Sequence, residues 1–111
     1  MTADRTLTIH RAHTLGLPAA EALAARWLRE AQDQYGIHSA PEPLPDGAAP
    51  GQRHALQRSG VSGHLQVSAQ HFELVLRLGF LLNAHRERIR AHIERNLDEV
   101  LAAASSNSAG A

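Results

Sequence analysis

Cysteine and lysine are both missing from this 111-residue chain, and one Trp, one Tyr and two Phe are its only aromatic rings besides histidine. The absence of cysteine excludes a disulfide framework, a thiol nucleophile and thiolate metal sites. No apolar run approaches the ~20 residues that a bilayer-spanning helix needs. The first residues lack the continuous apolar stretch of a signal peptide. We therefore expect a cytoplasmic protein without a membrane span.

The positive charge comes from arginine alone, and eleven basic residues balance eleven acidic ones. A general nucleic-acid binder would be expected to show a basic excess and exposed stacking aromatics. We therefore expect no nucleic acid among the partners. The chain also has eight histidines, which gain positive charge as the pH falls toward ~6.5.

Alternating apolar residues predict two paired strands between residues 58 and 82. A reversal at Ala69 and Gln70 sets Val67 opposite Phe72 and Leu65 opposite Leu74. One face of this hairpin is then apolar, and the other carries His, Gln, Ser and Arg. A sheet with one buried face and one solvent-exposed face is typical of antiparallel strands.

Two further strands are expected at Thr6–His10 and His54–Arg58. Between them, residues 40–51 contain four prolines and two glycines, which predicts a mobile loop with at best the start of an edge strand at His38–Ala40. For Leu56 to share a face with the hairpin core, the turn near residues 59–63 must contain an even number of residues.

Helical periodicity predicts two amphipathic helices. One runs for about 18 residues from Pro18 and stops at Gly36. The other follows Asn83, a possible N-cap, and carries an apolar arc that ends at Ala104. The predicted fold is α+β with the order β-α-β-β-β-α, an antiparallel sheet with two helices packed on one face. Residues 1–104 form one domain, and residues 105–111 are expected to be a disordered tail.

Histidine pairs are the first candidates for a metal site. His10 and His13 form an HxxH pair, but zinc needs further ligands, which His54, His64 or His71 would have to supply. His85 and His92 share a helical face about 10.5 Å apart by helical rise, too far to chelate one ion. These positions are better explained as solvated or boundary histidines, and we predict no metal.

Arg86 falls in the middle of the apolar arc of the last helix. Its side chain either extends along the apolar arc and places its charged end in water, or is held over the sheet. In the second case it pairs with an acid such as Glu73 or binds an anionic group. The candidate binding residues are Arg58, Arg86, Arg90 and His13.

No catalytic constellation is evident. Ser59 lies in an RSGVSG segment that lacks the spacing of a nucleophile elbow, and positive φ in a hairpin explains Gly60 and Gly63 more simply. A Gly-rich phosphate loop, an HExxH motif and a paired-carboxylate motif are all missing. We predict that the protein is not an enzyme and needs no cofactor.

Four segments together resemble the small bacterial family labelled polyhydroxyalkanoic acid system proteins. They are Ile9-His10-Arg11 with His13-Thr14-Leu15-Gly16, then Tyr35-Gly36, then Arg58-Ser59-Gly60-Val61 with Gly63, and finally Leu78-Gly79-Phe80-Leu81-Leu82 leading to Ile89, Ile93, Leu97 and Asp98. The resemblance covers nearly the whole ordered chain. Where the family usually has a charged, Trp-containing hairpin, this chain has its Pro-rich segment.

The resemblance implies a non-catalytic accessory role around polyhydroxyalkanoate granules, and it supplies no catalytic residues. The first hypothesis is a domain that binds a granule surface or a granule-associated protein, and a second copy of the chain, in a homodimer, is a further candidate partner. The alternative is a small-molecule domain with an apolar cleft between the long helix and the sheet for an acyl-type ligand; an enzyme ranks third. An exposed apolar patch would favour the first, and a pocket gated by Arg86 would favour the second.

Overall fold

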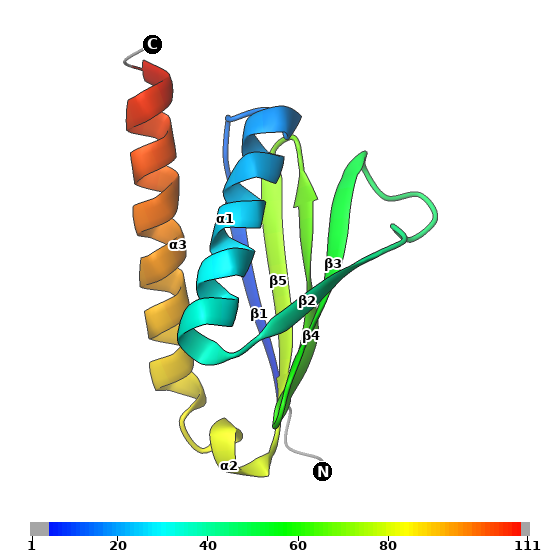
Figure 1. The fold of residues 1–111 in the computed structure, drawn as a ribbon, viewed down its shortest axis with the longest axis vertical. Coiled ribbons are helices and arrows are strands. Elements are labelled where there is room, and N and C mark those ends of the chain that lie inside the picture. The colour runs from blue at the N-terminus through cyan, green and yellow to red at the C-terminus, as the bar shows by residue number, and fades with distance from the viewer. Residues whose placement is uncertain (1–4, 110–111) are drawn as a thin grey trace.

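The computed structural model describes residues 5–109 and forms a two-layer α+β fold, with a sheet on one side and helices on the other (Figure 1). The sheet has five strands in the order β1-β5-β4-β3-β2, and every neighbouring pair is antiparallel. The elements in chain order are β1 (Thr6–Ala12), α1 (Leu17–Tyr35), β2 (His38–Glu42), β3 (Gly51–Arg58), β4 (Val61–Ser68), β5 (His71–Leu78), α2 (Phe80–Asn83) and α3 (Arg86–Ala109).

The predicted pairing of the central hairpin is confirmed. Leu65 lies opposite Leu74 and Val67 lies opposite Phe72 across β4 and β5, and all four side chains are buried. Burial of one face fixes the pairing, because a slip of one residue would turn every apolar side chain toward water.

The turn between β3 and β4 has two residues, an even number as predicted, and Leu56 is buried on the same face as Leu65. Gly60 in this turn has a φ of 81°, as expected for a hairpin glycine. For Gly63 the expectation of positive φ was wrong. Gly63 lies within β4, where an added Cβ would approach the Val75 carbonyl oxygen to 1.9 Å, so close backbone approach is the reason for glycine.

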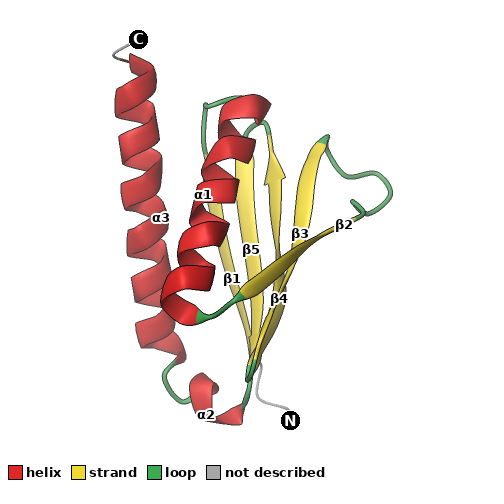
Figure 2. Cartoon of the chain, in the orientation of Figure 1, coloured by secondary structure: helices red, strands yellow, loops and turns green. Residues whose placement is uncertain are grey.

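The Pro-rich segment forms more regular structure than its composition suggests. β2 extends to Glu42 and β3 already begins at Gly51, so the sheet gains a fifth strand and only residues 43–50 form the loop (Figure 2). β2 is an edge strand, and proline is tolerated there because one side of the strand has no hydrogen-bonded neighbour. The expected order β-α-β-β-β-α therefore lacks one strand.

The helices begin and end for local reasons. α1 starts beside Pro18 and ends at Gly36, which adopts φ 67° and donates its N–H to the C-terminal turn. Asn83 is not the N-cap of the long helix as predicted. It is the last residue of the short helix α2, and α3 begins three residues later.

Both long helices cover the same face of the sheet (Figure 1). Their buried side chains, including Trp27 and Leu28 of α1 and Leu97 of α3, pack on the inward residues of the strands. Arg11 at the end of β1 holds α3 in place through ion pairs with Asp98 at 2.9 Å and Glu94 at 3.3 Å. Its hydrogen bond with Asp98 is the main reason why the pKa of Arg11 is raised.

The last helix, α3, continues to Ala109, past residue 104, where we expected the ordered domain to end. Residues 110–111 lie outside the described residues, so the disordered tail stays a prediction.

Candidate functional site

An apolar cleft of about 390 Å³ lies between α1, α3 and one end of the sheet. Its floor is buried, since Leu76 and Leu78 are only 3% and 1% exposed. The apolar side chains that line it are Trp27, Ala31, Ile37, Val61, Leu76, Leu78, Leu82, Ile89 and Ile93. Its size falls in the range of about 300–1,000 Å³ that small-molecule sites occupy.

The rim of this cleft is polar and exposed. It consists of Tyr35, Arg58, Arg88 and His92, and none of the residues lining the cleft is acidic. The Tyr35 hydroxyl is hydrogen-bonded to His92 Nε2, and the two rings meet edge to face. Arg58 Nη1 donates a 2.7 Å hydrogen bond to the Tyr35 carbonyl oxygen, so this predicted binding residue also ties β3 to the end of α1.

Sequence reasoning missed Tyr35, Arg88 and His92 as members of one site. The four-residue spacing of Arg88 and His92 on α3 shows that they share a helix face. Nothing local shows that Tyr35, more than fifty residues earlier, meets them. A pocket gated by Arg86 would have favoured the small-molecule alternative, but Arg86 does not line this cleft; Arg58 and Arg88 are the arginines that line it.

The short helix α2 exposes two large apolar side chains. Phe80 is 75% exposed and Leu81 is 79% exposed, whereas the next residue, Leu82, lines the cleft. The guanidinium of Arg5 lies 5.8 Å from the centre of the Phe80 ring. We call Phe80 and Leu81 the apolar tip.

Arg86 and Arg90 lie along the free edge of β1. Arg86 Nη2 donates to the Thr6 carbonyl oxygen at 3.0 Å, and Arg90 Nη1 donates to the Thr8 carbonyl oxygen at 3.1 Å. An edge strand presents unpaired carbonyl groups, and these two arginines satisfy two of them. Arg86 forms an ion pair with Glu87 at 4.0 Å, not with the predicted Glu73, which faces the open side of the sheet.

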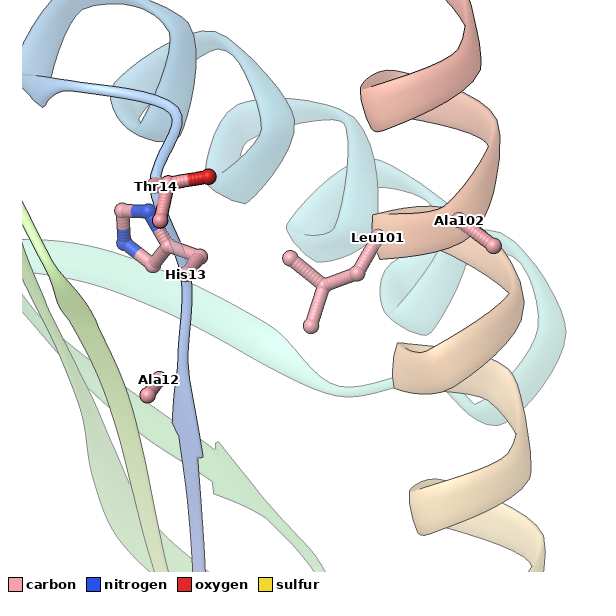
Figure 3. A pocket seen from close by; sticks show the side chains of 5 residues that line it. All are labelled: Ala12, His13, Thr14, Leu101 and Ala102. Carbon is pink, nitrogen blue, oxygen red and sulfur yellow. The ribbon is translucent and has the colours of Figure 1, made fainter.

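His13 follows the end of β1, where it lines a pocket together with Leu101 of α3 (Figure 3), and its side chain is hydrogen-bonded to the end of β4. Its Nε2–H donates to the Ser68 carbonyl oxygen at 3.1 Å, and its Nδ1 accepts the Leu15 N–H at 3.2 Å. An imidazole that donates with one nitrogen and accepts with the other is neutral. Burial, which includes packing of the ring 4.6 Å from that of Phe72, lowers the pKa of His13. This candidate binding residue thus has a structural explanation.

The face of the sheet that the helices leave uncovered carries a polar network around Arg53. This guanidinium contacts Glu42 at 2.7 Å, Gln66 at 3.0 Å and His64 Nδ1 at 3.1 Å. Burial, followed by the charge of Arg53, lowers the pKa of His64. Burial also lowers the pKa of His54. We call His13, His54 and His64 the shielded histidines.

Between residues 5 and 109 no three His, Asp or Glu side chains are placed to hold a metal ion together. His10 instead packs against His71, with ring centres 4.7 Å apart. No helix in that range is long and apolar enough to cross a membrane.

Comparison with known proteins agrees with the motifs. Residues 7–101 match the family described as "Putative polyhydroxyalkanoic acid system protein (PHA_gran_rgn)", and this range covers the five strands except for Thr6, as well as most of α3. The chain matches no curated protein and no solved structure at a significant level. The protein belongs to the polyhydroxyalkanoic acid system protein family.

Proposed function

We propose that this protein is a non-catalytic accessory protein of polyhydroxyalkanoate metabolism that binds the surface of storage granules through its apolar tip. The observation that carries the proposal is the exposure of Phe80 and Leu81 side by side on α2. Large apolar side chains exposed together mark an interaction surface more often than chance scatter does. Family membership supplies the connection to the polyester.

The charges around the apolar tip support binding to an anionic, apolar surface. α2 lies at the end of the fold that also holds the start of β1, the β3–β4 turn and the start of α3 (Figure 1). Among the residues that the structure describes, these segments carry Arg5, Arg58, Arg86 and Arg88 together with the acidic Glu87. An excess of positive charge at one end steers the protein toward a negatively charged surface, even though the chain as a whole is neutral.

The proposal assigns no reaction to the chain. Ser59, the nucleophile that was considered, lies exposed in the β3–β4 turn, and its carbonyl oxygen accepts a 3.3 Å hydrogen bond from Arg58 Nε. We propose that the protein works in the cytoplasm at the granule surface, without a cofactor.

Fluorescent fusion imaging in a polyester-accumulating host stained with Nile red tests this function. The double variant Phe80→Ser/Leu81→Ser should lose granule localisation while keeping the circular dichroism and melting temperature of the wild type, because both side chains are exposed. Ala91→Ser on the exposed side of α3 is the matched control. A double variant that stays folded and still localises would refute the role of the apolar tip.

A second measurement separates the surface from a protein partner. Isolated granules are treated with protease, washed and mixed with purified protein. Binding that survives this treatment supports docking on the granule surface. Binding that is lost indicates a granule-associated protein as the receptor and contradicts direct docking. Gel filtration of the same protein shows whether it binds as a homodimer.

A further inference from the structure

We propose that the cleft between α1, α3 and the sheet is a binding site for a single-chain acyl carboxylate. The proposal goes beyond granule docking, because it concerns the cleft and its rim rather than the exposed side chains of the apolar tip.

The interior of the cleft matches an alkyl chain. Nine apolar residues line it, and exposure decreases from the rim to the floor formed by Leu76 and Leu78. Trp27 and Ala31 close it from the α1 side, and both are buried. A narrow apolar space of this kind gains affinity from each methylene that it removes from water.

The rim matches an anionic head group. Two arginines, a tyrosine hydroxyl and a histidine surround the opening, and no carboxylate lines the cleft to compete for them. Arg58 already donates to the Tyr35 carbonyl oxygen, but a guanidinium has five N–H donors, so others can still reach a ligand. Arg88 lines the cleft and is exposed, and it forms no ion pair within the described part of the chain, so no acidic side chain there neutralises its charge. Arginine binds carboxylates through two parallel, charge-assisted hydrogen bonds, and a trimethylammonium head group has no acceptor atom for them.

The test is an NMR titration of the ¹⁵N-labelled protein with decanoate below its critical micelle concentration. Saturable shifts should appear at cleft residues such as Val61, Ile89 and Ile93. Decyltrimethylammonium, which has a similar chain and the opposite charge, should bind at least about tenfold more weakly. Octanoate should bind more weakly than decanoate, by about fourfold for each methylene removed.

Two variants assign the binding to the cleft. Arg88→Glu should weaken decanoate binding by about tenfold or more, whereas Arg95→Glu, the same change on an exposed part of α3 that does not line the cleft, should leave it within about twofold. Ile93→Trp fills the cleft and should abolish binding. Circular dichroism and melting curves of each variant show that it is folded.

Results of three kinds would overturn the proposal. The first is the absence of saturable shifts at the cleft residues. The second is equal binding of decanoate and decyltrimethylammonium, or equal affinity of Arg88→Glu and the wild type. The third is a dimer whose dissociation on dilution shifts the cleft amides, since a second copy of the chain would then be the occupant.

Discussion

Substitution of Arg86 distinguishes a structural role of this residue from a role in docking, because the two roles predict different changes in melting temperature and in granule localisation. Its Nη2 donates to the Thr6 carbonyl oxygen at 3.0 Å, and its side chain is 28% exposed. Arg86→Gln removes the charge and shortens the side chain, so this bond to the edge of β1 is lost. A hydrogen bond to a charged group contributes about 1.5–3 kcal/mol to the free energy of unfolding, and partial exposure places Arg86 toward the lower limit.

Such a loss is measurable in a small domain. Each 1 kcal/mol shifts the melting temperature of a domain of about 100 residues by roughly 4–8 °C. We therefore expect Arg86→Gln to melt several degrees below the wild type and to unfold at a lower urea concentration, with an unchanged m-value. Arg88→Gln is the matched control, because it makes the same change two residues away, at an arginine that has no ion pair with any residue that the structure describes.

Granule localisation of the same variants completes the experiment. If Arg86 mainly caps the strand edge, Arg86→Glu should lower stability, and any localisation defect should follow the unfolded fraction. If Arg86 and Arg90 contact an anionic partner, Arg86→Glu should abolish localisation with little change in melting temperature. A melting temperature of Arg86→Gln equal to that of Arg88→Gln would refute the edge-capping argument.

Further changes test the fold and its pH dependence. Phe72→Ala should cost about 3–5 kcal/mol of unfolding free energy, because Phe72 is 3% exposed in the core; an unchanged urea midpoint would contradict the register. Replacing residues 43–50 by a short Gly/Ser turn should change stability little, since each halving of a loop is worth only about 0.6 kcal/mol. Deleting residues 40–50 also removes part of β2, so its melting temperature should be lower. The shielded histidines have pKa values below those of the unfolded chain, so the unfolded state binds more protons and stability should fall as the pH drops through about 6.5. Urea midpoints at several pH values check this, and His64→Gln should flatten the dependence.

The parts of the fold that the sequence predicts are those where burial imposes a pattern. The register of β4 and β5 follows from alternation because Val67 and Phe72 must both face the helices. The expected start of α3 and the expected extent of β2 were wrong because burial imposes no such pattern on these segments. Four of the five residues of β2 are exposed, so neither alternation nor propensity marks them as a strand. In the four-residue helix α2, one turn of chain exposes Phe80 and Leu81, against the usual expectation that a run of large apolar residues is core.

The candidate site could not be predicted from the sequence for a different reason. Tyr35 ends α1, Arg58 ends β3, and Arg88 and His92 belong to α3, so the rim exists only once antiparallel pairing has set the β3–β4 turn beside the end of α1. The helical wheel placed Arg86 on the apolar side of α3, and that placement is correct, but it cannot distinguish a cleft from a strand edge. The difference is one of angle around the helix axis, and only the packed structure shows which element lies on each side. Arg86 and Arg90 face β1, whereas Arg88, Ile89 and His92 face α1 and the cleft. Arg86 and Arg88, two residues apart on α3, therefore have different roles. Arg86 holds the edge of the sheet, whereas Arg88 presents its charge to a ligand, and paired substitutions at the two positions separate these roles.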